Sequence, residues 1–193
     1  MNRADAYALL TEYVTDQSLV RHMLAVEAAM RAYARKYGED EEKWAVVGLL
    51  HDFDYERWPN PPDHPLKGAE ILRGHGYPED VIHAICSHAD YLTDRFPRVS
   101  RLDKALYACD ELAGLIHATA RLRPGGITDL TAASVLKKMK KKDFAKNINR
   151  DDVVRGAADF GVPLEEHVQF EIDAMKTIAA ELGLVGGPPG GEG

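Results

Sequence analysis

Apolar residues return every three or four positions along most of this chain, which is the spacing of one face of an α-helix. Leu19, Met23, Val26 and Met30 form the first such face, and Gly38 follows as the expected left-handed helix end. No segment alternates convincingly between apolar and polar residues as a strand would. The pattern predicts helices over 18–37, from Asp40 through the run WAVVGLL, and over 64–73, 78–86, 100–122, 132–142, 151–160 and 164–182.

Prolines and glycines separate these segments. The stretch ERWPNPPD holds three prolines and cannot be helical, and Pro124-Gly125-Gly126 ends the long helix that precedes it. The final GGPPGGEG has no side chains to bury, so we expect residues 186–193 to be a disordered tail. At 193 residues the remainder is most simply one domain. We therefore predict an all-α, single-domain helical bundle over residues 1–185.

Charge and composition narrow the range of partners. A formal net charge of −7 argues against strong nucleic-acid binding and against binding to anionic membranes. No apolar run approaches the roughly 20 residues that span a bilayer, and the N-terminal residues lack a signal-peptide pattern. Cys86 and Cys109 are too few for a disulfide framework and are expected to be small buried residues in a cytoplasmic protein. The oligomeric state stays open.

A vicinal His-Asp pair, His51-Asp52, stands at the end of the apolar run WAVVGLL. Neighbouring helical residues point about 100° apart, so both can reach one ion only at a helix end or with ligands from other elements. The chain offers such ligands in the order H…HD…H…H…D, and the full set is His22, His51, Asp52, His64, His88 and Asp110. Imidazole and carboxylate ligands without thiolates suit Mn, Fe, Co, Ni, Zn or Mg. His75, His83 and His167 fall outside this pattern and are expected to be structural or surface residues.

This ordered set resembles the HD-domain superfamily of metal-dependent phosphohydrolases from His22 to Asp110. The resemblance implies an HD-fold bundle with a metal site between its central helices. It also implies that His22, His51, Asp52 and Asp110 hold one divalent ion. His64 and His88 would hold a second, with Asp52 bridging the two. The segment HPLKGAEIL is similar to the HPxxGAxxL segment of two-metal members.

Several positions depart from the sequence patterns of the HD-domain families that the chain resembles. Ala89 replaces a second histidine, so no third ion is expected. The GYP at 76–78 precedes its helix, so the cyclic-dinucleotide function of the HD-GYP group is not carried over. The lysine of the HDIGK form is missing, because the chain continues Phe53-Asp54-Tyr55. The region from Ala108 onwards also resembles a group of small HD-domain hydrolases whose function is unassigned.

The predicted activity is metal-dependent hydrolysis of a phosphate ester, in a nucleotide or another small phosphorylated metabolite. Two divalent ions about 3.5–4 Å apart can hold a phosphate and lower the pKa of a water molecule towards 7. Asp52 is the expected centre of this chemistry. Asp54 and Glu56 are candidates for the general acid, although both could equally belong to a solvated loop face.

Candidate substrate-binding residues follow the predicted metal ligands along the sequence. His117 and Arg121 share a helix face with Asp110 and could meet a phosphate, or they could pack and cap the helix. Lys137 and Lys138 open a basic run, which could steer an anionic substrate or form a solvated helix face.

Two rival functions use the same ligands. A non-catalytic module could bind metal and nucleotide without turnover, and a di-iron oxygenase could hold two irons in the same set. We rank the hydrolase first, the binding module second and the oxygenase third.

Overall fold

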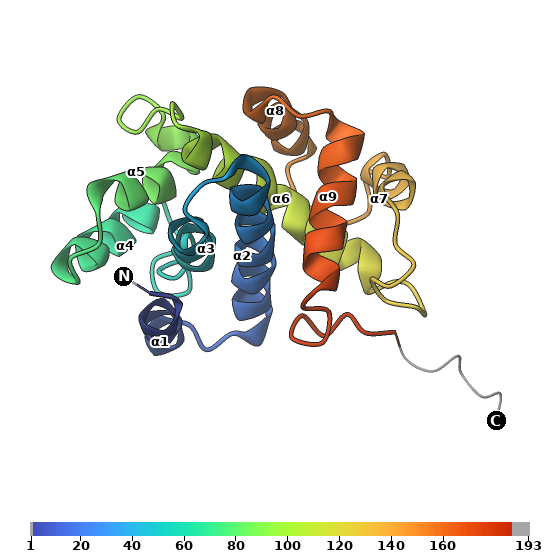
Figure 1. Cartoon of the computed structure of the whole chain (residues 1–193), viewed down its shortest axis with the longest axis horizontal. Coiled ribbons are helices and arrows are strands. Elements are labelled where there is room, and N and C mark those ends of the chain that lie inside the picture. The colour runs from blue at the N-terminus through green and yellow to red at the C-terminus, as the bar shows by residue number, and fades with distance from the viewer. Residues whose placement is uncertain (1, 187–193) are drawn as a thin grey trace. The chain divides into compact units, whose positions relative to one another are not determined.

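Helices form the framework of the chain in the computed structural model, which describes residues 2–186 (Figure 1). In chain order they are α1 (Arg3–Tyr13), α2 (Gln17–Tyr37), α3 (Glu41–Leu50), α4 (Asp63–Gly74), α5 (Glu79–Ser87), the short 3-10 helix η1 (Asp90–Leu92), α6 (Arg101–Ala120), α7 (Ala132–Met139), α8 (Arg150–Phe160) and α9 (Leu164–Lys176). Within residues 2–186 no strand forms, and one isolated bridge pairs Gly126 with Val185. The all-α prediction is confirmed.

Most predicted helix ends agree with the structure. Gly38 ends α2 at φ 68°, and the Asp40 side chain caps α3 by accepting from the Lys43 amide at 3.0 Å. The structure corrects the predicted helices at three points. Helix α1 was not predicted, α7 ends at Met139 and not at 142, and α9 ends at Lys176 and not at 182. After Lys176 the chain continues in tight three-residue turns, such as Ile178 N to Met175 O at 3.2 Å.

The chain divides into two compact units, Met1–Tyr107 and Ala108–Gly193. Helix α6 begins in the first unit and ends in the second. The single domain expected over residues 1–185 stays a prediction. The tail expected to be disordered lies, apart from Gly186, outside the described residues.

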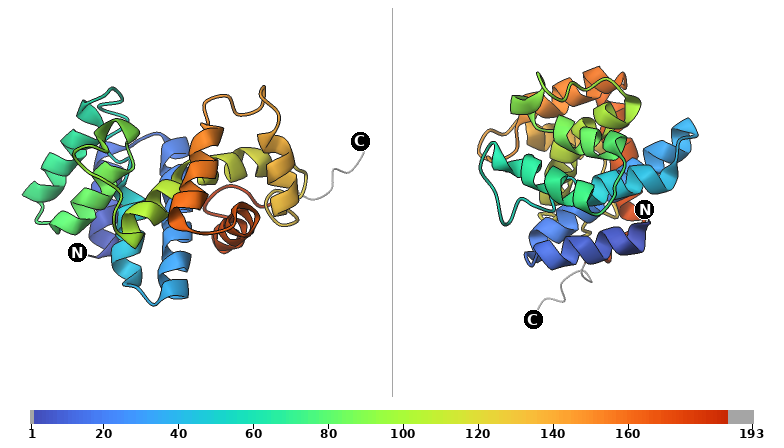
Figure 2. Two further views of the ribbon diagram at one scale, coloured as in Figure 1. Left: turned by 90° about the horizontal axis from the view of Figure 1, so that it is seen from above. Right: turned by 90° about the vertical axis from the view of Figure 1, so that its left-hand side faces the viewer.

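In the first unit, α2 packs along α3 while α1 and α5 also contact α3 (Figure 1). Met23, Val26 and Met30 of α2 are fully buried, as their spacing predicts. Gly48 lets α3 approach α2 closely, because a Cβ at this position would lie 3.0 Å from the Glu27 Cα. Helices α4 and α5, in green in both views of Figure 2, pack on each other. The helix that delivers the His-Asp pair is therefore held by several neighbours.

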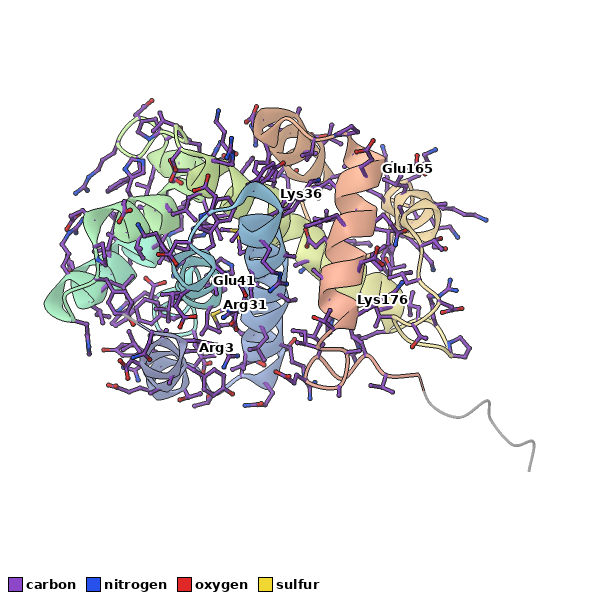
Figure 3. All side chains as sticks on the ribbon, in the orientation of Figure 1. Arg3, Arg31, Lys36, Glu41, Glu165 and Lys176 are labelled. Carbon is purple, nitrogen blue, oxygen red and sulfur yellow. The ribbon has the colours of Figure 1, made fainter. Side chains whose placement is uncertain are left out.

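A buried carboxylate joins the first helices. Glu27 on α2 is 5% exposed, and it accepts from Arg3 Nε at 2.6 Å and from Arg31 Nη2 at 3.1 Å. Arg31 also donates to Glu41, at the start of α3, at 3.1 Å (Figure 3). Since a buried charge needs partners, this ion-pair network fixes α1 against α2 and links α2 to α3.

In the second unit, α9 packs against α7 and α8. Glu165 stands in the first turn of α9 and Lys176 in its last turn, so both suit the helix dipole (Figure 3). Beyond α9 the chain returns to Gly126, where Ile127 N donates to Leu184 O at 3.0 Å. None of the described helices has the length and apolarity required to cross a membrane.

Candidate metal centre

The His-Asp pair stands at a helix end, as the argument from spacing requires. Helix α3 ends at Leu50, and His51 is its C-cap residue. The His51 side chain is fully buried, and its Nδ1 lies 2.8 Å from the Gly48 carbonyl oxygen. A carbonyl can only accept, so Nδ1 carries the hydrogen and the neutral ring presents Nε2 as an electron-pair donor. That is the arrangement expected of a histidine metal ligand.

The rings of His64 and His88 are also oriented by an acceptor at Nδ1. His64 has extended backbone angles, φ −77° and ψ 136°, as expected before Pro65, and its Nδ1 lies 2.8 Å from Asp54 Oδ1. His88 caps the end of α5 with Nδ1 against the Ile85 carbonyl at 2.5 Å. Both rings therefore turn Nε2 towards each other, 3.2 Å apart.

Asp52 lies at the centre of these rings. Its Oδ1 is 3.3 Å from His64 Nε2 and 3.4 Å from His88 Nε2, and its Oδ2 is 3.6 Å from His51 Nε2. On the other side, His22 Nε2 lies 3.3 Å from His51 Nε2. The result is two potential ligand triads that share Asp52: His22, His51 and Asp52, and Asp52, His64 and His88.

These triads fit divalent metal ions. In each triad the ligand atoms lie within 4.8 Å of one another. Imidazole Nε2 atoms and carboxylate oxygens are all electron-pair donors, and a cation is what such a set stabilises when it converges. The Asp52 side chain keeps 16% of its surface exposed, so the cluster remains open to solvent.

Asp110, the remaining predicted ligand, belongs to the second unit. It lies on α6 and is partly buried. Its part in the metal centre stays a prediction.

The structure places both general-acid candidates in hydrogen bonds. Asp54 is fully buried, with Oδ1 against His64 Nδ1 and Oδ2 accepting from the Gly68 amide at 2.7 Å. Glu56 accepts from the Thr15 amide at 2.8 Å, the Thr15 hydroxyl at 2.6 Å and the Asp16 amide at 3.0 Å. Hydrogen bonds from the Asp16 amide and from Thr15 lower the pKa of Glu56. A role for either group in proton transfer stays a prediction.

The predicted substrate contacts lie in the second unit. His117 Nε2 is 3.3 Å from the Leu182 carbonyl, as expected of a packed histidine. Arg121 is exposed just after α6, and Lys137 is exposed in the last turn of α7. Lys138 lies over the Phe144 ring at 5.1 Å. Binding of substrate by these residues stays a prediction.

Sequence reasoning missed three neighbours of His64. The Tyr91 hydroxyl donates to the His64 carbonyl, the Tyr55 ring meets the His64 ring edge-on at 5.2 Å, and Gly68 holds Asp54. Burial, together with nearby Asp54 and Asp52, raises the pKa of Tyr91 to about 12, so it remains protonated at neutral pH.

The fold and the convergent side chains define an all-α protein with a candidate divalent-metal site. Residues 19–115 match the HD domain, and the chain belongs to the HD domain family, whose members are generally metal-dependent hydrolases.

Curated relatives share this region. The chain is similar to Ribonuclease Y of Nitratidesulfovibrio vulgaris strain DP4, with 25% identity over 191 residues, covering 88% of this chain and 36% of the relative. Ribonuclease Y of Oleidesulfovibrio alaskensis strain G20 is 29% identical over 120 residues, covering 59% of this chain and 20% of the relative. The chain thus spans well under half the length of the curated relatives it matches. No solved structure matches it.

Proposed function

We propose that the protein is a metal-dependent phosphohydrolase that cleaves a phosphate ester in a nucleotide or another small phosphorylated metabolite. The observation that carries this proposal is the pair of triads sharing Asp52, with each inner Nε2 directed at the shared carboxylate. Membership of the HD domain family supports it.

We assign roles to the chain's own residues. His22, His51 and Asp52 would hold one divalent ion, while Asp52, His64 and His88 would hold a second. Asp110 stays the further ligand that the sequence pattern predicts. When bound, such ions supply Lewis-acid chemistry, neutralising phosphate charge and lowering the pKa of water. Asp54 is a positioning residue, because it fixes the ring of His64 through Nδ1. Tyr91 is a second positioning residue, because its hydroxyl donates to the His64 carbonyl.

A second candidate is hydrolysis of an RNA phosphodiester. It is favoured by the relatives named Ribonuclease Y, because the similarity to one of them covers 88% of this chain. The basic run that begins at Lys137 would then attract the RNA backbone, against an unfavourable net charge of −7. Salt dependence separates the two candidates, since an RNA contact through several lysines weakens steeply with added salt.

The decisive experiment measures metal content and turnover on the same gently purified samples. Substrates are nucleoside monophosphates, cyclic nucleotides, p-nitrophenyl phosphate esters and single-stranded RNA. We expect turnover that a chelator removes and that added Mn²⁺, Co²⁺ or Zn²⁺ restores. Asp52→Ala should lose both bound metal and turnover, because both triads use this carboxylate. Asp94→Ala is the matched control, since Asp94 is exposed and outside both triads.

Other outcomes identify the rivals. Tightly bound iron with oxygen uptake would establish an oxygenase. Thermal stabilisation by a nucleotide without product would establish a binding module. An Asp52→Ala protein that hydrolyses normally would overturn the proposed mechanism.

A further inference from the structure

The second unit contains a separate cluster of metal-ligating side chains. Cys109 lies on α6, and His167 and Glu171 lie one turn apart on α9. One ligand atom of each lies within 4.8 Å of the others, and all three residues are fully buried. All three belong to the unit Ala108–Gly193.

Glu171 has an unusual environment for a carboxylate. Its side chain is fully buried, and the described residues give its oxygens no hydrogen bond of ordinary geometry, with the Cys109 thiol, a weak donor, as their neighbour. His167 Nε2 lies 3.9 Å from Oε2 and donates to the Ala108 carbonyl oxygen at 3.0 Å, a hydrogen bond that metal binding through this nitrogen would replace. A buried carboxyl group without hydrogen bonds is destabilising unless something else compensates it. Glu171 is thus a polar side chain directed into the cluster whose oxygens lack a hydrogen bond.

Cys109 and Glu171 are both fully buried, where a negative charge on either side chain is costly without a partner. A divalent cation would reverse this, because a thiolate and a carboxylate together balance a charge of two.

We propose that Cys109, His167 and Glu171 form a second, closed metal site of the zinc type. Sulfur, imidazole nitrogen and carboxylate oxygen are the ligand types that zinc takes in proteins. The site would join the Ala108–Ala120 part of α6 to α9 and so stabilise the second unit. This inference does not depend on phosphate-ester hydrolysis.

Cobalt provides a test specific to this site. A thiolate bound to Co²⁺ gives a charge-transfer absorption in the near ultraviolet, and the histidine triads contain no thiolate. Protein stripped of metal is titrated with Co²⁺, both folded and during refolding, because the site is buried. We expect the absorption band to appear and to saturate at one thiolate-bound Co²⁺ per chain.

Cysteine variants assign the band. Cys109→Ala should lose it, while Cys86→Ala should keep it, since Cys86 is a buried free cysteine outside the cluster. Glu171→Gln keeps the thiol and nearly the same volume, and should need more Co²⁺ for half-saturation. If Cys109→Ala fails to fold, the Co²⁺ affinity of Glu171→Gln still tests the proposed site.

Three results would overturn the proposal. They are no band in the wild-type protein under either condition, an unchanged band in Cys109→Ala, and unchanged Co²⁺ affinity in Glu171→Gln. Any of these would mean that Glu171 is simply a protonated, buried carboxyl group.

Discussion

The histidine triads and the Cys109 cluster are both groups of metal-ligating side chains, yet the protein supports them in opposite ways. Around Asp52, the rings of His51, His64 and His88 are each oriented through Nδ1 by a carbonyl or a carboxylate. Around Glu171, the carboxylate oxygens have no hydrogen bond among the described residues. The first cluster is open to solvent at Asp52, and the second is closed.

This difference separates two kinds of organisation. Rings that are already fixed by other groups can exchange an ion or a substrate while the fold stays the same. A cluster whose ligands lack other partners gains its stability only with an occupant. We therefore expect metal to affect activity at the first cluster and unfolding at the second.

The largest expected effect tests the support of His64. In Asp54→Asn, an amide would present its N–H₂ to either His64 Nδ1–H or the Gly68 amide, so one hydrogen bond is lost together with the charge. We expect Mn²⁺ affinity to fall about 10- to 100-fold, measured by calorimetry. Asp63→Asn, at an exposed position, is the control. Unchanged affinity would show that the orientation of His64 does not matter.

The next prediction contrasts the two carboxylates directly. With a chelator present, Glu171→Leu should stabilise the protein by about 1–3 kcal/mol, because it removes a buried group without hydrogen bonds. Asp54→Leu should instead destabilise it by a similar amount, since His64 and Gly68 lose their acceptor. Urea unfolding measures both variants. Shifts of the same sign would contradict the comparison.

A third prediction concerns the space around Asp54. A Cβ on Gly68 would lie 2.9 Å from Asp54 Oδ2 and 3.0 Å from the Phe53 ring. Gly68→Ala should therefore lower the free energy of unfolding by about 1–3 kcal/mol. Gly74→Ala on the same helix meets nothing within 4 Å and should leave stability unchanged or raise it by up to about 1 kcal/mol. Equal unfolding midpoints for the two variants would show that Asp54 can move.

The smallest effect depends on pH and lies at Glu56. Hydrogen bonds from Asp16 and Thr15 lower its pKa below the ordinary 4.5, so this carboxylate stabilises the fold above that pH. The contribution is lost as pH falls through the lowered value. Glu56→Gln should be slightly less stable than wild type at pH 7, and the gap should close in acid. Glu12→Gln, at an exposed position, should show no such pH dependence.

The sequence was sufficient where the signals were local. Apolar spacing with capping residues such as Asp40 and Gly38 placed most helices, because these contacts lie within a few residues. Helix α1 was missed because it buries only Ala6, Leu9 and Leu10 and is held by the distant pair Arg3–Glu27. The end of α9 depends on a return to Gly126, which no nearby residue signals.

The candidate metal centre shows the same division between local and long-range sequence signals. The order of histidines and aspartates named five residues that lie together in the structure, while the part of Asp110 stays a prediction. His51 and His88 stand at helix ends and His64 at a kink, whereas His22 lies within α2. The partner of each ring could not be deduced, because residues ten positions apart, such as Asp54 and His64, meet only after the loop has folded. The cluster at Cys109 was missed because His167 is 58 positions away along the chain.

The sharing of Asp52 makes the triads thermodynamically linked. Its Oδ1 faces His64 and His88, while its Oδ2 faces His51, so an ion on one side changes the charge and orientation available to the other. Linkage is reciprocal: an ion bound on the His64–His88 side would alter the affinity of the His22 side by the same coupling free energy as the reverse. Stepwise binding constants would therefore describe the pair as a whole, and neither half-site would have an affinity of its own.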